Sequence, residues 1–456
     1  MFFAASLATA PAANVVAIGD SLTAEYDTIP EIPGFSREAT AYAEVSVSGW
    51  ESRSWVEVLG ELRGDDFDFG GTRELPNVWS LPRMSGYERN WAVPGIDAGQ
   101  YEDFVTATAS SNFLHWTLRQ PLDEELRERA ERVVIWLGAN DFRGNYGRLY
   151  DGDSGASLIA GLVNDLGRII DHVKGRNGDL QIVVANVPDL GASPDKRAAH
   201  PDPEKRARVT AVTQAANAAI AQLAASKGVI VADVYKQTER LVQNVPRYFG
   251  AVEIFNAADA DNNPRYQFTR DGLHPNTPAQ IELARLIIRA FNEGYAAGIR
   301  QITDAEALDL LGIDPNQPYF DWLTELGLVK RGFKADPDRD GLPQLAEYAF
   351  HLNPTVADAA AWPVSAGGSI PGFPGESSIT YAPDPTRSRH VRVRPQYSSD
   401  GVKWTAVPEA NVLTNADGSF TAVIPPVGGE VQLRLKVALL PPLGSAAHFA
   451  VALPLP

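Results

Sequence analysis

The chain has 456 residues, and chains beyond about 300 residues usually divide into domains, so two or three domains are expected. Hydrophobic residues make up 44% of it and charged residues 21%, a balance typical of globular proteins. A formal net charge of -17 argues against non-specific nucleic-acid binding, and the absence of cysteine excludes disulfides, thiolate catalysis and cysteine-based zinc sites. No apolar run reaches the ~18 residues that a membrane-spanning helix needs.

The first 13 residues resemble the end of a secretory signal. They hold a short apolar stretch, and Ala8-Thr9-Ala10 fits the small-residue pattern of a cleavage site, although no basic residue precedes it. We interpret residues 1–13 as a residual signal segment. This interpretation predicts a secreted or periplasmic bacterial protein.

Short, continuous apolar runs then alternate with segments of helical period. The runs cover residues 15–18, 133–137, 182–187 and 229–234, and one-sided helical patterns cover 158–173 and 209–223. Strands that are apolar on both faces and joined through helices form a parallel sheet covered on both sides. We therefore predict an α/β domain over residues 14–298.

Two segments interrupt this alternation, residues 27–90 and 235–268. Loops of this length in a compact domain are usually functional, and in α/β sheets they gather at the strand ends where ligands bind. The first segment and its border contain four tryptophans whose faces could stack on sugar rings, with packing in the core as the alternative for each: Trp50, Trp55, Trp79 and Trp91.

The first apolar run ends in Gly19-Asp20-Ser21, which places a serine where a buried strand opens toward substrate. A serine hydroxyl needs a base, usually a histidine that a carboxylate orients. Of the seven histidines, only His274 has an aspartate, Asp271, at close spacing within a turn-like stretch. Residues 277–280 read as a capping box that starts the next helix, which would give Asp271 and His274 a rigid mount.

Acyl transfer also needs hydrogen-bond donors for the oxyanion of the tetrahedral intermediate. Two further stretches could supply them. Residues 90–95 end in Gly95, where the missing side chain lets the backbone N–H approach substrate, and Asn140 follows the apolar run 133–137 with an amide donor.

These four stretches resemble, in order, the four blocks of the GDSL-type SGNH hydrolase family: Gly19-Asp20-Ser21-Leu22, Asn90 through Gly95, Gly138-x-Asn140-Asp141 and Asp271-x-x-His274. The resemblance spans about residues 14–295. It implies a three-layer α/β/α, flavodoxin-like fold and catalysis without a cofactor. It also implies Ser21 as nucleophile, His274 as base, Asp271 as its orienting carboxylate, and an oxyanion hole from the N–H groups of Ser21 and Gly95 and the Asn140 side chain.

A second Gly-Asp-Ser occurs at residues 152–154 and is similar to the nucleophile box of chymotrypsin-type proteases. No buried strand precedes it, and it opens directly into the helical pattern 158–173. We therefore expect Asp153 or Ser154 to be a helix N-cap. The Gly-x-Ser-x-Gly signature of α/β-hydrolases is absent from the chain.

The chain changes character after residue 298. Residues 299–355 read as a helical connector, 356–377 as a linker, and 378–456 as a β-sandwich-like module, because period-two alternation marks 391–397 and 431–437.

The connector carries a twelve-position loop, 336–347, that is similar to the EF-hand-like calcium loops joining domains in secreted bacterial proteins. Asp336, Asp338 and Asp340 take positions one, three and five, Gly341 follows, and Glu347 takes position twelve. Leu342 would offer its carbonyl oxygen. We predict a structural calcium ion here, with a solvated acidic helix cap as the alternative.

The resemblance implies ester hydrolysis but leaves the substrate open. The tryptophans and the multidomain exported layout favour a carbohydrate esterase that removes acetyl or other short acyl groups, with Trp91, Arg143 and Tyr146 as candidate pocket residues. A lipase, phospholipase or arylesterase is the alternative within the family. A non-catalytic protein that binds glycans or a cell surface is the alternative from another class.

Overall fold

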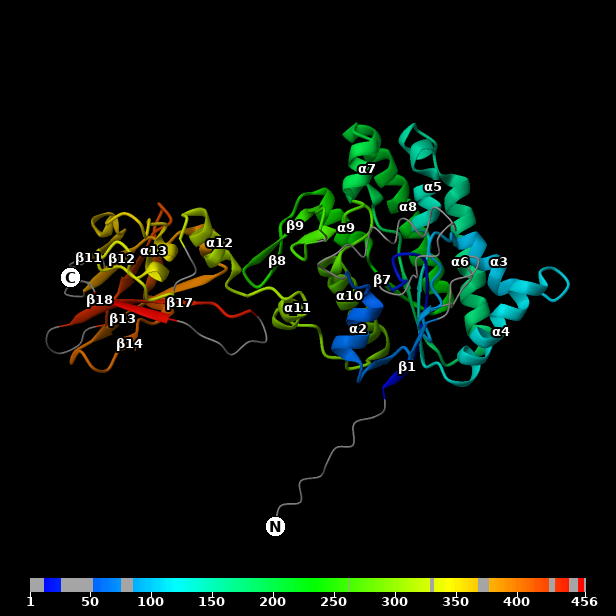
Figure 1. The fold of residues 1–456 in the computed structure, drawn as a ribbon, viewed down its shortest axis with the longest axis horizontal. Coiled ribbons are helices and arrows are strands. Elements are labelled where there is room, and N and C mark those ends of the chain that lie inside the picture. The colour runs from blue at the N-terminus through cyan, green and yellow to red at the C-terminus, as the bar shows by residue number, and fades with distance from the viewer. Residues whose placement is uncertain are drawn as a thin grey trace, which may run out of the picture. The chain divides into compact units, whose positions relative to one another are not determined.

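The computed structural model describes residues 12–25, 52–74, 85–261, 263–328, 332–367, 377–425, 431–442 and 450–454. They divide into two compact units (Figure 1). The first unit draws on residues up to 247 and on 253–302, and the second on 248–252 and on residues from 303 onward. Most of the expected signal segment, together with Trp50 and Trp79, lies outside the described residues.

Five parallel strands form the central sheet of the first unit in the order β2-β1-β5-β6-β7. Their bounds are β1 (Ala13–Gly19), β2 (Phe67–Asp68), β5 (Arg132–Trp136), β6 (Gln181–Ala185) and β7 (Ile230–Ala232). Residues 15–18 of β1 are completely buried, as expected for a strand covered on both faces. The predicted parallel sheet is confirmed, and β2 is an additional edge strand.

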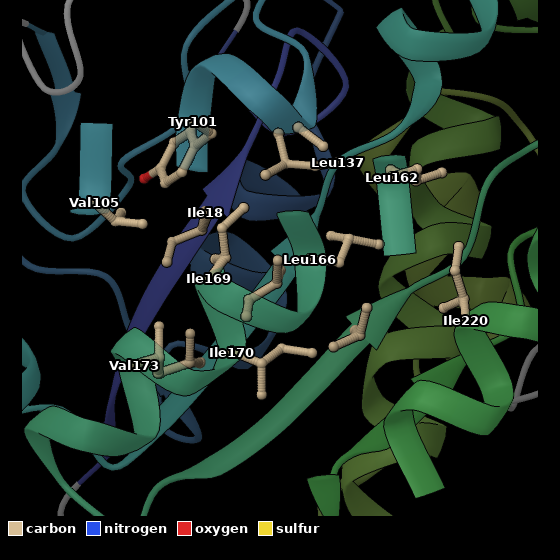
Figure 2. Close-up of a cluster of buried hydrophobic side chains, with 14 of the residues drawn as sticks. Ile18, Tyr101, Val105, Leu137, Leu162, Leu166, Ile169, Ile170, Val173 and Ile220 are labelled. Carbon is tan, nitrogen blue, oxygen red and sulfur yellow. The ribbon is translucent and has the colours of Figure 1, made fainter. Parts of the chain in front are cut away.

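Helices cover both faces of this sheet, which gives the predicted three-layer α/β/α SGNH-hydrolase architecture. On one face α10 (Thr277–Tyr295) packs against α2 (Trp55–Arg63), β6 and β7. The other face is covered by α3 (Ala98–Thr106), α4 (Phe113–Glu128), α6 (Ala156–Arg176) and α8 (Pro203–Lys227), with α5 (Ala139–Tyr150) beside α8. Figure 2 shows the apolar layer between the sheet and the helices on this face. In it, Ile18 of β1 lies among α6 side chains such as Leu166 and Ile169.

The two expected insertions contain secondary structure of their own. The first holds α2, β2 and a two-stranded sheet of β3 (Thr72–Glu74) and β4 (Ser85–Tyr87). The second holds α9 (Tyr235–Val242) and a three-stranded sheet of β8 (Arg247–Phe249), β9 (Val252–Ala258) and β10 (Tyr266–Phe268). Between β6 and α8 lie the short helices η1 (Leu190–Ala192) and α7 (Pro194–Ala199).

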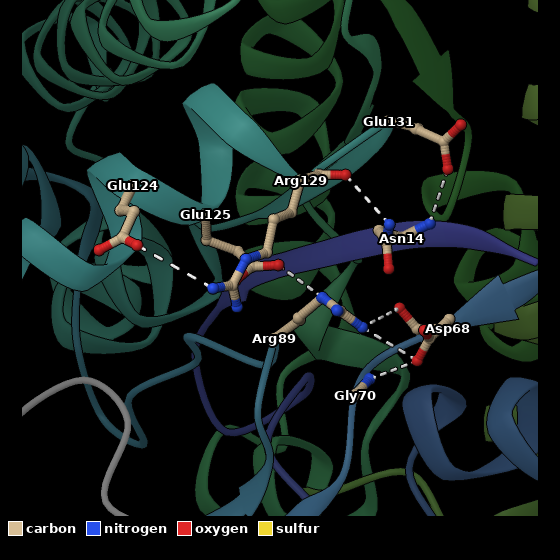
Figure 3. Close-up of polar contacts among 8 residues, drawn as sticks. All are labelled: Asn14, Asp68, Gly70, Arg89, Glu124, Glu125, Arg129 and Glu131. Carbon is tan, nitrogen blue, oxygen red and sulfur yellow. Dashed lines mark hydrogen bonds and ion pairs between the residues drawn. The ribbon is translucent and has the colours of Figure 1, made fainter.

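A polar cluster ties the segment before Gly95 to the sheet (Figure 3). The Arg89 guanidinium contacts Asp68, which ends β2, at 3.0 Å and Glu125 of α4 at 2.5 Å. From this anchor the chain runs alongside β1, because Trp91 N donates to Ala17 O (2.7 Å) and Val93 N donates to Gly19 O (2.9 Å). Residues 89–93 therefore lie beside the last residues of β1, directly before Ser21.

The second unit contains two four-stranded antiparallel sheets with the orders β11-β12-β16-β15 and β14-β13-β17-β18. The strands are β11 (Val364–Gly367), β12 (Ser378–Tyr381), β13 (Val391–Ser398), β14 (Thr405–Ala406), β15 (Val412–Thr414), β16 (Phe420–Val423), β17 (Gln432–Leu439) and β18 (Ala450–Pro454). Its helices are α11 (Asp304–Leu310), α12 (Gln317–Glu325) and α13 (Gln344–Phe350), with short η2 (Ala359–Ala361), η3 (Pro385–Arg387) and η4 (Glu409–Asn411). The predicted antiparallel β-module is confirmed.

Both sheets share one apolar core with α12 and α13. Ile379 of β12 and Leu435 of β17 lie in it together with Tyr319 of α12 and Leu345 of α13. Strand β11 lies within the residues we expected to form a linker, so that expectation is wrong for 364–367. A composition rich in Pro, Gly and Ala concealed an edge strand whose backbone pairs with β12. The finer domain boundaries stay a prediction.

Candidate active site

Ser21 lies in a tight turn that follows β1. The N–H groups of Thr23 and Ala24 both donate to the carbonyl oxygen of Asp20 at 3.1 Å, which closes the turn. A side chain at Gly19 would meet Thr23 Oγ1 at 2.3 Å, so the turn requires glycine at this position. The turn holds Ser21, which is 7% exposed, at the carboxyl end of the parallel sheet.

His274 reaches Ser21 from the loop between β10 and α10. Its Nε2 lies 3.0 Å from Ser21 Oγ, and its Nδ1 is hydrogen-bonded to Asp271 Oδ2. The other carboxylate oxygen, Asp271 Oδ1, accepts from the N–H groups of Leu273 (2.9 Å) and His274 (3.0 Å) and from Thr269 Oγ1 (2.8 Å). The structure therefore brings together the three residues that the sequence analysis singled out.

The charge on Asp271 is stabilised locally. Burial alone would raise the pKa of its carboxyl, but the hydrogen bond and positive potential of His274 and the N–H donors of the loop hold that pKa well below its usual range. An ionised Asp271 accepts the Nδ1 proton of His274. With its proton on Nδ1, the imidazole can accept the proton of Ser21 at Nε2.

The start of α10, which fixes the loop carrying Asp271 and His274, differs from the predicted capping box. The N-cap of α10 is Asn276, whose Oδ1 accepts from Thr277 N (2.8 Å) and from Ser52 Oγ (2.8 Å). Gln280 does not close a box, because its Oε1 accepts from Trp55 N (3.1 Å) and its Nε2 donates to Leu22 O (3.4 Å). The helix start is thus fixed to α2 and to the Ser21 turn.

The backbone N–H groups of Ser21 and Gly95 lie on the two loops that follow this strand end. Gly95 has a φ of 79°, a left-handed conformation that favours glycine, and follows the segment that pairs with β1. Within the part of the chain that the structure describes, no protein group accepts the N–H of Ser21 or of Gly95. Both donors remain available to a ligand.

The Asn140 side chain lies between these two segments. Its Nδ2 donates to Ile96 O at 3.0 Å and to Asp20 Oδ2 at 3.3 Å. Ile96 follows Gly95 and Asp20 precedes Ser21, so one amide links both of the loops from which the sequence analysis expected oxyanion donors. A hydroxyl bonded to a buried imidazole–carboxylate pair beside amide donors is suited to acyl transfer.

Residues 17–280, more than half of the chain, match the GDSL-like Lipase/Acylhydrolase family. The chain belongs to this family. No curated protein matches it.

Several solved structures are similar to the GDSL-like hydrolase domain. They include an extracellular lipase from Streptomyces rimosus (16% identity over 61% of this chain and 100% of that one, TM-score 0.33). A phospholipase A1 from Streptomyces albidoflavus NA297 shows 14% identity over 62% and 99% of the two chains (TM-score 0.33). A carbohydrate esterase family 3 protein from Talaromyces cellulolyticus shows 15% identity over 62% and 97% (TM-score 0.32). Likenesses this distant leave the substrate of the present hydrolase open.

Two carboxyl groups beside Asn140, those of the buried Asp20 and the partly buried Asp141, were not singled out from the sequence. Asp20 is 1% exposed, and burial raises its pKa to about 7, with a further increase from Asp141 and opposing contributions from the Leu22 N–H and His274. Asp141 accepts from Ala98 N at 3.1 Å, and burial raises its pKa to about 6. The family blocks contain both aspartates, but only their burial distinguishes them from ordinary turn and helix-start residues.

The candidate pocket residues of this GDSL-like hydrolase differ in accessibility. Trp91 is 5% exposed and Tyr146 is 1% exposed, so both belong to the apolar core and their burial opposes direct substrate contact. Trp55 is completely buried in α2. Arg143 is exposed on α5 and remains a candidate.

The second Gly-Asp-Ser lies at the start of α6, without the expected cap. The N-cap is Gly155 in a left-handed conformation, while Asp153 Oδ1 accepts from Gly155 N at 2.8 Å and Ser154 Oγ accepts from Ala156 N at 3.4 Å. Both side chains satisfy N–H groups around the helix start, and neither contacts a histidine among the described residues. The second Gly-Asp-Ser therefore has a structural role at the start of α6.

The acidic loop of the second unit gathers its carboxylates. Oxygen atoms of Asp336, Asp338 and Asp340 lie within 4.8 Å of one another, as do those of Asp340, Glu347 and Asp358. Glu347 is completely buried, and neither of its carboxylate oxygens has a hydrogen-bond partner among the residues that the structure describes. Burial and the neighbouring aspartates raise its pKa to about 8. Asp358 was missed from the sequence because it lies beyond the twelve-position loop.

Proposed function

We propose that the chain is a serine esterase in which Ser21 is the nucleophile, His274 the general base and Asp271 its orienting carboxylate. The observation that carries the proposal is the 3.0 Å contact between Ser21 Oγ and His274 Nε2, with Asp271 bonded to the opposite ring nitrogen. The N–H groups of Ser21 and Gly95 and the amide of Asn140 form the oxyanion hole.

The reaction proceeds in two steps, formation of an acyl-enzyme and its hydrolysis. Ser21 Oγ attacks the ester carbonyl carbon while His274 Nε2 takes the hydroxyl proton, and the oxyanion is stabilised by the amide donors. Collapse of the tetrahedral intermediate breaks the bond to the alcohol, which leaves with the proton from His274, and an acyl-enzyme remains. Water then attacks the acyl-enzyme with His274 again as base, which releases the acid and restores the Ser21 hydroxyl.

We propose a short acyl group, acetyl above all, as the part transferred. An apolar cavity of about 70 Å³ lies beside residues that flank the proposed nucleophile and base. Its lining includes Leu22, Ala192, Leu273, Pro275 and Leu283. A cavity of ~150 Å³ in another protein holds one benzene ring, so a cavity of half that volume suits a chain of a few carbons. Trp55 and Trp91 are buried, which opposes their stacking on a sugar ring. A carbohydrate as the alcohol part of the ester is therefore supported by the multidomain layout and the predicted export.

Short acyl esters should be preferred. In a series of p-nitrophenyl esters from acetate to decanoate, we expect kcat/KM to fall beyond butyrate, because each additional methylene exceeds the cavity. Leu283→Ala should raise the hexanoate-to-acetate ratio of kcat/KM about ten-fold by enlarging the cavity. Leu286→Ala is the matched control, since Leu283 and Leu286 are both on α10 and both 7% exposed, but only Leu283 lines the cavity.

The same series separates the alternatives. A maximum at octanoate or decanoate would assign the chain to the lipase-like members of its family. Hydrolysis of none of the esters would favour the glycan- or surface-binding alternative. Acetate release from acetylated xylan and acetylated alginate, measured alongside, decides whether the alcohol side is a polysaccharide.

We propose export of the protein from a bacterial cell, in keeping with the resemblance of its first residues to a secretory signal. None of the described helices has the length and apolarity to cross a membrane. Secretion would be measured as the fraction of protein in the medium when the full chain is expressed in a bacterial host.

A structural calcium ion at loop 336–347 is proposed for the second unit. The buried, unpartnered oxygens of Glu347 fit a cation, because a carboxylate without a hydrogen bond is costly to bury. The ion would take oxygen ligands from Asp336, Asp338, Asp340 and Glu347 and from the Leu342 carbonyl. Asp358 adds a further carboxylate, and its own N–H donates to Asp340 Oδ2 at 3.0 Å.

Calcium should therefore stabilise the second unit. At a calcium concentration about 100 times the Kd, binding adds ~2.7 kcal/mol, which corresponds to about 5–10 °C in melting temperature for a unit of this size. Calorimetry of the chelator-treated protein with and without calcium measures this increase. Glu347→Gln should remove most of it, whereas Glu409→Gln, whose side chain is 93% exposed in the same unit, should leave it intact. An unchanged melting temperature on adding calcium would contradict the proposal.

A further inference from the structure

The carboxyl group of Asp20 makes two contacts that serve different ends. Its Oδ1 accepts from Leu22 N at 2.9 Å, a bond within the Ser21 turn. Its Oδ2 accepts from Asn140 Nδ2 at 3.3 Å, a bond to a residue 120 positions away. The first contact shapes the turn, and the second connects the turn to an oxyanion donor.

The amide of Asn140 is held from both sides. One acceptor is Ile96 O at 3.0 Å, next to Gly95, and the other is Asp20 Oδ2 at 3.3 Å, next to Ser21. Both acceptors are on loops that end at the same edge of the sheet, so the nitrogen has little freedom to move. The contact to Asp20 is the longer and weaker of the two. When an oxyanion forms nearby, the hydrogen directed at Asp20 is the one that can turn to it.

We propose, on the basis of the function proposed above, that Asp20 is a positioning residue for the oxyanion hole. Its carboxyl group holds the Asn140 amide in place between the Ser21 and Gly95 loops until the tetrahedral intermediate takes over the hydrogen bond. Asp20 does not itself contact the reacting atoms in this role. It acts through Asn140.

Two substitutions separate the positioning contact from the turn contact. Asp20→Asn keeps a carbonyl oxygen for Leu22 N but turns an NH₂ group toward the NH₂ group of Asn140, so donor faces donor. Asp20→Ser keeps an acceptor for the turn and is too short to reach Asn140. If one variant fails to fold, the other carries the test.

The decisive measurement is a double-mutant cycle with Asn140→Ala, using p-nitrophenyl acetate. We expect Asp20→Asn to lower kcat about ten-fold with KM changed by less than about two-fold, because the Asn140 amide that Asp20 positions is needed only when the oxyanion forms. Asn140→Ala alone should lower kcat by about 10²–10³. In the Asn140→Ala background, Asp20→Asn should change kcat by less than about two-fold, since the residue through which Asp20 acts is gone.

An equal loss of kcat from Asp20→Asn in both backgrounds, or no loss in the native background, would overturn the inference. Asp123→Asn is the control for burying an amide in place of a carboxylate, because Asp123 is 4% exposed in α4 and contacts Arg119, His172 and Arg176 instead. It should leave kcat of the folded enzyme unchanged. A native protein that fails to hydrolyse the ester refutes the proposed function itself, whereas an additive cycle in an active enzyme refutes only the role of Asp20.

Discussion

Ser21→Ala should abolish ester hydrolysis. The substitution removes the oxygen that we propose attacks the substrate, and it leaves the buried imidazole of His274 without the hydroxyl that it contacts. By analogy with other serine hydrolases, we expect kcat for p-nitrophenyl acetate to fall about 10⁶-fold. The fold should persist, since the Ser21 side chain is small and its hydrogen bond to His274 is local to the site. Hydrolysis is measured by stopped-flow for the native protein and by long-duration assays for Ser21→Ala. A melting curve of each sample shows whether the protein is folded.

The chain supplies its own control for this substitution. Ser154 ends a second Gly-Asp-Ser sequence, at the start of α6. The Ser154→Ala variant should retain full activity. A fluorophosphonate probe should modify the peptide that carries Ser21 in the native protein and leave the Ser21→Ala variant unmodified. Equal hydrolysis by the native protein and Ser21→Ala would show that another group performs the chemistry.

Four of the five strands of the central sheet, β1, β5, β6 and β7, could be predicted because each contains a short, continuous apolar run. Residues 15–18 and 133–137 carry that signal in isolation, and a strand that is apolar on both faces has few alternatives to the middle of a parallel sheet. The stretches at the strand ends are also local patterns. Their convergence follows once the strands are parallel, because the carboxyl ends then lie at one edge.

Burial of individual aromatic side chains could not be predicted in the same way. Trp55 and Trp91 occur in segments rich in Pro, Gly and polar residues, which left open whether each packs in the core or forms a platform for a sugar ring, and both lie in the core. Strand β2 and helix α2 in the first insertion bring Phe67 and Trp55 against the sheet, and this packing depends on contacts between distant residues. Composition describes a segment but does not fix which of its residues face inward.

Long-range polar contacts were likewise beyond the reach of the sequence. The hydrogen bond from Asn140 to Asp20 and the position of Asp358 beside Glu347 both depend on how separate loops fold back. The calcium loop motif ends at residue 347, so nothing in its spacing points to a ligand eleven residues later. Strand β11 was missed for a related reason, since an edge strand needs only a partner and not a strong apolar pattern of its own.

Asp271→Asn should leave the geometry of the loop nearly intact and still cost about 10⁴-fold in kcat. The new amide can keep its carbonyl oxygen on the N–H groups of Leu273 and His274, but its NH₂ group would face His274 Nδ1. The imidazole then accepts at Nδ1 and carries its proton on Nε2, where it points at Ser21 and cannot receive the hydroxyl proton. Steady-state kinetics with p-nitrophenyl acetate measures the loss.

A second Asp–His pair in the chain provides a control. Asp384 Oδ2 lies 2.9 Å from His351 Nδ1 in the other unit, although the His351 side chain is exposed whereas that of His274 is buried. Hydrogen bonds outweigh burial to lower the pKa of Asp384 to about 2, so Asp384→Asn should disturb this pair and leave kcat unchanged. Stability gives an independent readout. Because the pKa of Asp271 is depressed in the folded state, its carboxylate stabilises the fold above the ordinary aspartate pKa of about 3.9 and loses that contribution as the pH falls. The stability difference between the native protein and Asp271→Asn should therefore be largest near neutral pH and shrink below about pH 4, and a difference that instead grew on acidification would contradict an ionised Asp271 behind His274.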